Sequence, residues 1–150
     1  MNKPVVFLDA DVIFAGAAAP TEHGASHVIL RLGEITLIDC VTSTQVVTEV
    51  ERNLAEKLPD KLPTLRLILS RSLRVVPDPE PQELTPYKGQ ADLKDLPILG
   101  AALQQGCRFL LTFNIRPIRW SVPPLHYRRS PYGVPDVLQR RRPAHPAASR

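Results

Sequence analysis

Four short apolar runs recur along the first three quarters of the chain. They occupy residues 4–9, 35–39, 73–76 and 108–113. The first of them contains Val5-Val6-Phe7-Leu8, which is continuous rather than alternating with polar residues. Continuous apolar runs are typical of strands that are buried on both faces of a sheet. We therefore predict four strands, the first of them fully buried.

Helical patterns lie between these runs. A first helix is predicted where apolar residues recur at offsets of 0, 3, 4 and 7 along one face, and Gly33 is expected to end it. The face consists of Ala25, Val28, Ile29 and Leu32. A second helix is predicted to run to about Leu58. Thr42 and Gln45 have the spacing of a capping box before it, and Ser43 is an alternative cap.

Two more helices and two loops complete this pattern. A leucine stripe predicts a helix over about 60–71, with Asp60 as a plausible cap, and a further helix is expected over about 95–105. The stripe consists of Leu58, Leu62, Leu65 and Leu69. The small residues of 15–20 predict a loop, as do the prolines and acids of 77–91.

Strands that alternate with helices predict an α/β fold with a mostly parallel sheet covered on both faces. In such sheets, ligands bind outside the carboxyl ends of the strands. Asp9 and Asn114 each follow a predicted strand, so both are expected at that edge.

Four oxygen-bearing side chains are candidates for one site. Asp9 and Asn114 end strands, Glu49 lies on the second helix, and Asp95 opens the last one. Such oxygen atoms can together hold Mg²⁺ or Mn²⁺, and a cation held there can activate a water and neutralise charge on a phosphate.

Each candidate also has a structural interpretation. Asp9 and Asn114 could belong to turns, and Asp95 could be a simple helix cap. Asp11 could bind a cation or support the loop beside Asp9. Helix geometry does not separate Glu49 from Glu51, which flanks the same apolar stripe.

The charge is divided unevenly along the chain. Residues 1–114 carry 11 Lys and Arg against 14 Asp and Glu, a net charge of −3, whereas residues 115–150 carry 8 Arg against one Asp, a net charge of +7. The basic segment also contains seven prolines and no sustained hydrophobic period. We therefore expect a folded domain at 1–116 and an irregular basic tail at 117–150.

Other features limit the class of protein. No apolar run reaches the roughly 18 residues of a membrane span, and no signal-peptide pattern precedes the first strand, so a cytoplasmic protein is expected. Cys40 and Cys107 form no CxxC pair, and His23 and His27 are not spaced from them as in a zinc finger. Two reduced, buried thiols are the simplest interpretation.

Four segments resemble the motifs of one known family. Phe7-Leu8-Asp9-Ala10-Asp11-Val12-Ile13 is similar to the opening motif of PIN-domain proteins, notably the VapC-like toxins of prokaryotic toxin–antitoxin pairs. Residues 43–54, 94–102 and 111–114 resemble the second, third and fourth motifs. The sequence departs from the family at Asp11, where Asn is usual, and at Asn114, where many members have Asp.

The resemblance implies a three-layer α/β/α fold and a Mg²⁺- or Mn²⁺-dependent endoribonuclease. Its register selects Glu49 as the acid of the second motif. It implies that Asp9, Glu49 and Asp95 hold the metal, and that Asn114 and Thr112 position a water or a second ion. Asp92 matches a frequent neighbouring acid. The implied partners are an RNA substrate and a cognate antitoxin, with a homodimer also expected.

Two other functions remain as alternatives. Residues 7–12 also fit the DxDxV motif of haloacid-dehalogenase-like phosphatases, in which Asp9 would be a phosphoryl-accepting nucleophile, but the acidic pair that this fold needs does not follow residues 108–112. A catalytically weakened PIN-like binding module is the second alternative, because an amide at Asn114 brings no charge.

The tail departs from the family pattern. Members usually continue into one more strand that completes the sheet, whereas here the best strand candidate is residues 133–138, interrupted by Pro135. A replaced C-terminus, for example by a frameshift, is one hypothesis. An RNA-contacting arm is another, since Trp120, Tyr127 and Tyr132 lie among arginines.

Overall fold

The computed structural model describes residues 3–18 and 24–113, together with the backbone of residues 125–128 and 136–140. Its sheet has the order β3-β2-β1-β4-β6-β5. The strands are β1 (Val5–Leu8), β2 (Asp39–Ser43), β3 (Arg74–Val76), β4 (Phe109–Thr112), β5 (Leu125–Arg128) and β6 (Asp136–Arg140). β1 to β4 are parallel, β6 is antiparallel to β4, and β5 is antiparallel to β6.

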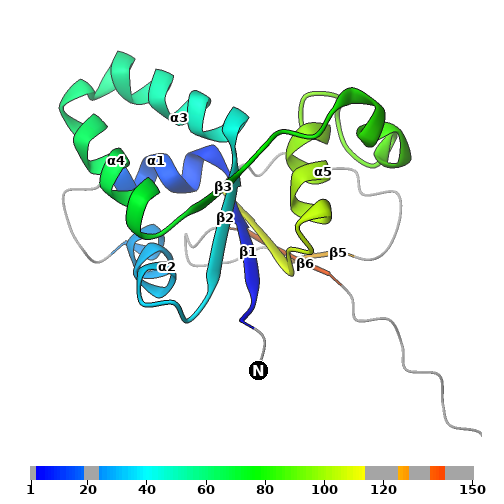
Figure 1. Cartoon of the computed structure of the whole chain (residues 1–150), viewed down its shortest axis with the longest axis horizontal. Coiled ribbons are helices and arrows are strands. Elements are labelled where there is room, and N and C mark those ends of the chain that lie inside the picture. Colours follow the sequence, from blue (N-terminus) through cyan, green and yellow to red (C-terminus); the bar gives the residue numbers. More distant parts are fainter. Residues whose placement is uncertain (1–2, 19–23, 114–124, 129–135, 141–150) are drawn as a thin grey trace, which may run out of the picture.

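Helices cover both faces of the sheet. The elements are α1 (Ala10–Ala18), α2 (Ala25–Glu34), α3 (Thr44–Lys57), η1 (Pro59–Lys61), α4 (Leu62–Arg71), η2 (Pro81–Tyr87) and α5 (Leu96–Gln104). Figure 1 shows α1 to α4 gathered on one side of the sheet and α5, with η2 beyond it, on the other. The predicted α/β fold with a mostly parallel sheet between helical layers is therefore confirmed.

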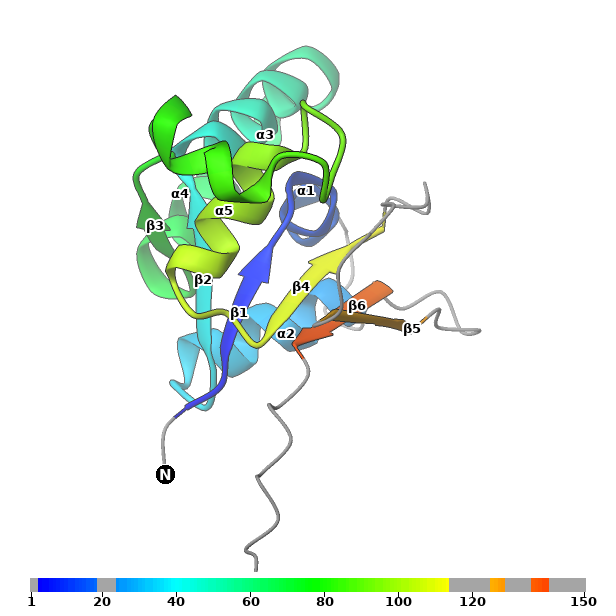
Figure 2. The same ribbon diagram turned by 90° about the vertical axis from the view of Figure 1, so that its right-hand side faces the viewer.

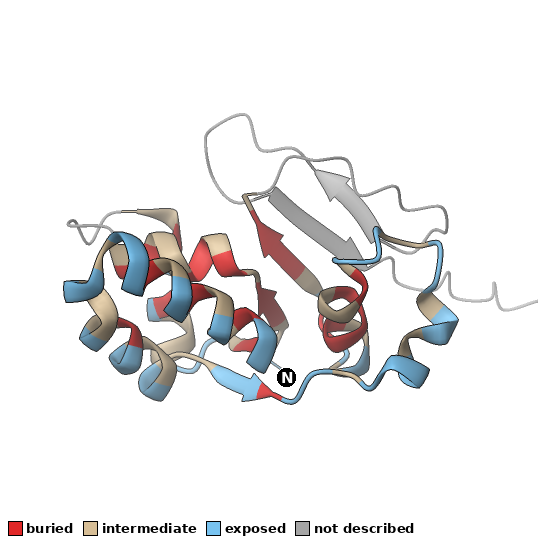
Figure 3. Cartoon of the chain, turned by 90° about the horizontal axis from the view of Figure 1, so that it is seen from above, coloured by how far each residue is buried: buried red, intermediate tan, exposed pale blue. Residues whose placement is uncertain are grey.

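The core lies where the first strand meets the helical layers. Phe7 and Leu8 of β1 are fully buried, as are Val46, Val50 and Leu54 on the inner face of α3. Figure 3 shows the buried surfaces of the helices turned towards the sheet and the exposed ones towards solvent. Cys40 and Cys107 are both buried thiols, as predicted.

The prediction of the second strand at 35–39 was wrong. Ile35 and Leu37 are 57% and 59% exposed, and Thr36 between them has a φ of 62°. These residues form the turn after α2, and β2 begins only at Asp39. Pairing with β1 fixes this register, because Cys40 and Val41 lie opposite buried residues of β1.

Two predictions about the first helical region were also wrong. The small residues predicted as a loop at 15–20 are helical as far as Ala18. On α2, the buried residues are Ser26 and Leu30, whereas Val28 is 53% exposed. Gly16 of α1 faces Leu30, since a Cβ at Gly16 would lie 2.5 Å from a methyl carbon of that leucine. The small residues thus permit close packing of α1 against α2.

The later helices largely follow the prediction. Ser43 caps α3 by accepting a hydrogen bond from the Val46 amide at 3.5 Å. Leu65 of the leucine stripe is buried, and the other three leucines are partly buried against the core. Asp60 is not the cap of α4, because the short helix η1 precedes it and Lys61 occupies the N-cap position.

Two strands lie in the segment predicted to be an irregular tail. β6 begins at Asp136, directly after Pro135, and pairs with β4, so the sheet does continue beyond the fourth parallel strand. A proline just before a strand leaves the strand's own amide hydrogens free to pair. The predictions for the rest of residues 117–150 fall outside the described residues, and the domain boundary at 116 stays a prediction.

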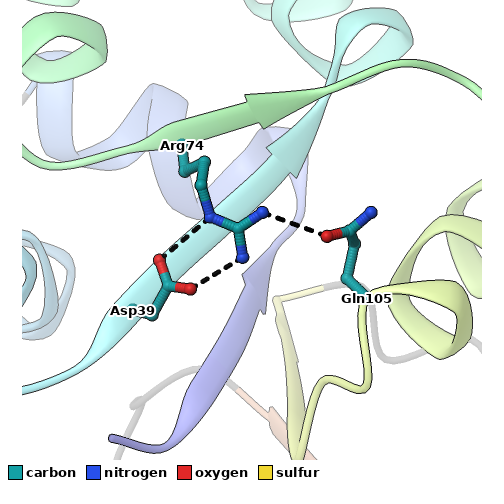
Figure 4. A network of polar contacts seen from close by, with 3 residues as sticks. All are labelled: Asp39, Arg74 and Gln105. Atoms are coloured by element: carbon teal, nitrogen blue, oxygen red, sulfur yellow. Dashed lines mark hydrogen bonds and ion pairs between the residues drawn. The ribbon is translucent and has the colours of Figure 1, made fainter.

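A polar network joins elements at the amino ends of the strands. Arg74, the first residue of β3, donates two hydrogen bonds to the Asp39 carboxylate at the start of β2, at 2.7 and 3.3 Å. It also donates one to the side chain of Gln105, which follows α5, at 3.0 Å (Figure 4). This network lies at the edge of the sheet opposite to the carboxyl ends of the parallel strands.

Candidate metal centre

The carboxyl ends of β1 and β4 bring Asp9 next to Thr112. The two strands are parallel neighbours (Figure 2), and their register places Leu8 opposite Leu111. Asp9 continues this ladder, because its amide donates to the Leu111 carbonyl oxygen at 3.0 Å. α1 begins immediately afterwards at Ala10, whose amide donates to Oδ1 of Asp9 at 2.8 Å.

One hydroxyl group links two carboxylates. Oγ1 of Thr112 lies 3.0 Å from Oδ2 of Asp9 and 3.2 Å from Oδ2 of Asp11, which is in the first turn of α1. The Phe113 amide also donates to Oδ2 of Asp11, at 2.9 Å. Strand β4 and the residue after it thus hold both acids of the opening motif in place.

Both carboxylates are poorly solvated. Burial raises the pKa of Asp9, the hydrogen bonds from Ala10 and Thr112 oppose this, and the charge of Asp95 raises it further. Burial and the neighbouring Asp9 charge raise the pKa of Asp11 to about 6. Negative charge at this edge of the sheet is therefore only partly compensated by the described residues.

One carboxylate oxygen stands out in this cluster. Oδ1 of Asp11 is buried and accepts no hydrogen bond from the part of the chain that the structure describes, although Oδ2 of the same group accepts one from the Phe113 amide. A buried carboxylate oxygen without a partner is costly in a protein interior. Together with the nearby Asp9 carboxylate, it suits a hard cation such as Mg²⁺, which prefers oxygen ligands and often takes only one or two carboxylates from the protein.

Asp95 reaches the same edge from the other face of the sheet. α5 leads through a short connection into β4, so it runs antiparallel to the strands and its N-terminus lies at their carboxyl ends. Asp95 stands at the N-cap position, but its side chain makes no capping hydrogen bond. It is half-buried, whereas Asp92 is exposed. Asp95 thus occupies the N-cap position, as the sequence predicted, without capping the helix through its side chain.

Glu49 lies in the second turn of α3, between the buried Val46 and Val50. Its side chain is half-buried, and that of Glu51 is exposed. Within residues 3–18 and 24–113, no group of three or more Asp, Glu, His or Cys side chains is close enough to hold a metal ion. The structure thus brings Asp9 and Asp11 together, places Asp95 within electrostatic range of Asp9, and leaves Glu49 apart from them. Asn114 lies outside the described residues.

Two contacts in this cluster had no signal in the sequence. The Phe113 amide is a backbone group, so no residue type reveals it. The hydroxyl of Thr42, on β2, donates to the carbonyl oxygen of Leu8, the residue before Asp9. A threonine in a strand is common and does not predict this contact.

The family model of the PIN domain matches residues 5–116, from the start of β1 to just past β4. The chain belongs to the PIN-domain family. This match includes all four predicted motifs, and the PIN fold is the one that their order implied. No curated protein matches the chain.

A solved structure shares this PIN fold. It is the crystal structure of the VapC20 toxin of Mycobacterium tuberculosis, which cleaves the sarcin-ricin loop. The TM-score is 0.50 with 18% sequence identity, over 69% of this chain and 85% of that one. At this identity the likeness concerns the fold. No helix in the described part of the PIN chain is long and apolar enough to cross a membrane.

Proposed function

We propose that this PIN-domain protein is a Mg²⁺- or Mn²⁺-dependent endoribonuclease that hydrolyses RNA phosphodiester bonds. The observation that supports it most is the Asp9–Asp11 pair, two half-buried carboxylates that share the Thr112 hydroxyl and have raised pKa values. Perturbed acids gathered at one point are more typical of a functional site than of a purely structural one.

Asp9, Asp95 and Glu49 would hold the metal, with Asn114 beside them and Asp11 contributing its buried Oδ1. When bound, a divalent cation supplies a Lewis acid that lowers the pKa of a water and offsets charge developing on the phosphate. The chain's own residues fix the geometry: Thr112 orients Asp9, the Phe113 amide orients Asp11, and Ala10 anchors the other oxygen of Asp9. Asp92 is proposed to support the site from the rim.

The biological role that we propose is that of the toxin in a toxin–antitoxin pair, acting on RNA, held by a cognate antitoxin and able to form a homodimer. This role rests on the VapC-like motifs. The phosphatase alternative required a different fold, and membership of the PIN family argues against it.

A catalytically weakened module is the second candidate. It is favoured by one observation, namely that no three acids among the described residues stand close enough to hold an ion. It predicts the same fold with weak or absent metal binding.

Cleavage of a mixed RNA pool tests the nuclease directly. Wild type is compared with Asp9→Ala, Asp95→Ala and the matched control Asp60→Ala, which removes an exposed acid from η1. We expect cleavage that requires Mg²⁺ or Mn²⁺, stops in EDTA, is lost in the first two variants and persists in the control. Cleavage that survives in both site variants contradicts the proposed site. No cleavage and no calorimetric Mn²⁺ binding by wild type supports the weakened module.

A further inference from the structure

Thr42 has a fully buried side chain at the carboxyl end of β2. Its hydroxyl donates to the carbonyl oxygen of Leu8 at 3.0 Å, across 34 residues of sequence. Leu8 is also fully buried, and Asp9 follows it directly. The hydroxyl therefore fixes the peptide group that joins Leu8 to Asp9, just before the Cα atom that carries the Asp9 side chain.

Packing in the surrounding core does not require a hydroxyl at this position. Val41 and Val46 nearby in the sequence are fully buried, and valine has nearly the same shape as threonine. A buried hydroxyl is tolerated only where it finds a hydrogen-bond partner. Here that partner is the backbone carbonyl of Leu8, the last residue of β1.

The end of β1 is thereby held from both neighbouring strands. On one side, Thr42 of β2 binds the Leu8 carbonyl oxygen. On the other side, the Leu111 carbonyl oxygen of β4 accepts a hydrogen bond from the Asp9 amide, and the Thr112 hydroxyl donates one to the Asp9 carboxylate. The residue at the site is restrained at its amide, at its carboxylate and at the peptide before it.

We propose that Thr42 is a positioning residue that sets the direction of the Asp9 carboxylate. The proposal rests on the function proposed above, because the orientation of the Asp9 carboxylate matters only if that carboxylate holds a cation. Residues that orient a metal ligand typically affect metal affinity or activity by roughly 10- to 100-fold when changed. Since Thr42 acts through a backbone group, we expect about tenfold, at the lower end of that range.

Two variants separate the hydroxyl from the packing. Thr42→Val keeps the volume and removes the donor, whereas Thr42→Ser keeps the donor and removes a methyl group. Thr44→Val is the matched control, because the Thr44 hydroxyl donates to the Val76 carbonyl oxygen at the end of β3, at 3.3 Å, and that strand does not flank Asp9.

Three quantities are measured on the full chain: RNA cleavage, the Mn²⁺ dissociation constant by calorimetry, and hydrogen exchange of the Asp9 amide by NMR. We expect Thr42→Val to weaken cleavage and Mn²⁺ binding about tenfold and to speed Asp9 exchange. Thr42→Ser is expected to lower the melting temperature more while keeping near-wild-type cleavage and binding. Thr44→Val should leave all three quantities unchanged.

The proposed nuclease activity and the proposed positioning role of Thr42 can fail separately in this experiment. If wild type neither cleaves RNA nor binds Mn²⁺, the proposed nuclease fails, and Asp9 amide exchange alone decides on Thr42. Faster exchange in Thr42→Val but not in Thr42→Ser still supports positioning. Exchange, binding and cleavage in Thr42→Val that all match wild type overturn it, as does a loss of activity that follows the methyl group rather than the hydroxyl.

Discussion

Asp11 lies close enough to Asp9 for the negative charge of Asp9 to raise its pKa, which burial has already increased and which reaches about 6. Both carboxylates contact the same Thr112 hydroxyl. Folding therefore brings two like charges together in a place where water screens them only in part. This cost depends on pH and on any cation that binds there.

The first prediction concerns the pH dependence of folding stability in the absence of metal. The Asp11 pKa is higher in the folded chain than the ordinary 3.8, so its stabilising contribution is complete below pH 3.8 and is lost as pH rises through about 6. In EDTA, the free energy of unfolding of Asp11→Asn should thus rise relative to that of wild type as the pH goes from 4.5 to 7.5. After allowing for solvent screening, we expect this rise to be about 1–2 kcal/mol. Urea unfolding at both pH values measures this gain.

A parallel variant at an exposed acid serves as the control for this prediction. Asp60→Asn removes an exposed acid from η1, outside the Asp9–Asp11 pair, and is unfolded under the same conditions. An Asp11→Asn curve that stays parallel to wild type across this range would mean that Asp11 is as well solvated in the folded chain as in the unfolded one.

The second prediction separates two acids on α3. Glu49 is half-buried on the side of α3 that also carries buried valines, and Glu51 is exposed. If Glu49 belongs to the metal site, Glu49→Gln should weaken cleavage by at least tenfold, since removing a charged ligand costs more than about 1.4 kcal/mol of transition-state stabilisation. Glu51→Gln should cleave like wild type. Steady-state cleavage of one RNA at saturating Mn²⁺ compares them.

The opposite ranking would be informative. If Glu51→Gln lost activity and Glu49→Gln kept it, the register of the second motif would be wrong by half a turn. Equal and full activity in both variants would remove α3 from the site and leave Asp9, Asp11 and Asp95 as its acids.

The sequence predicted the position of Asp9, which follows a strand, better than that of Glu49, which lies on a helix. Asp9 follows a continuous apolar strand, and the edge that it shares with β4 follows from parallel topology alone. Glu49 is different, because a helix residue reaches a site only through the tilt and rotation of the helix. These depend on the packing of Val46, Val50 and Leu54, which no local pattern specifies.

The error at β2 has a related physical cause. Ile35, Leu37 and Ile38 look like a strand, whereas the true strand ends in Thr42 and Ser43, two polar residues that are buried. Each of them makes a hydrogen bond, to Leu8 and to the start of α3, that compensates for its burial. Hydropathy alone cannot anticipate such pairing, because the partners lie on other elements.

The third prediction concerns Gly33 on α2. A Cβ at this position would lie 2.7 Å from the Ser72 carbonyl oxygen and 3.0 Å from the Cys40 sulfur. Helix propensity favours alanine by about 1 kcal/mol, but a clash with a backbone atom in a packed region costs about 1–3 kcal/mol. Because the nearest atom is a backbone oxygen that cannot turn aside, we expect the clash to outweigh the gain in helix propensity, and Gly33→Ala to lower the free energy of unfolding by about 1–2 kcal/mol. Chemical denaturation checks this.

Gly24 provides the comparison for this change. It precedes α2 with a φ of −72°, and a Cβ there would meet no atom of the described residues within 4 Å. Gly24→Ala should change stability by only a few tenths of a kcal/mol, because the poorer N-cap preference of alanine and the lower entropy of its unfolded chain act in opposite directions. A Gly33→Ala variant more stable than wild type would show that α2 moves away from the end of α4 at little cost.

The last prediction concerns the ion pair at the other edge of the sheet. Arg74 binds both carboxylate oxygens of Asp39, which is the favourable two-point geometry, but the two side chains are 47% and 33% exposed. Exposed pairs contribute at most about 1 kcal/mol. A double-mutant cycle with Asp39→Asn and Arg74→Met should give a coupling of about 0.5–1 kcal/mol that shrinks in 1 M salt.

The same variants should leave RNA cleavage unchanged, because Asp39 and Arg74 begin their strands and Asp9 follows the end of β1. A coupling above about 2 kcal/mol that resists salt would indicate a pair shielded from solvent. A loss of cleavage without a loss of stability would instead show that the amino ends of β2 and β3 influence the opposite edge. Since the ion pair and Asp9 lie at opposite ends of the parallel strands, we expect stability and activity to respond independently here.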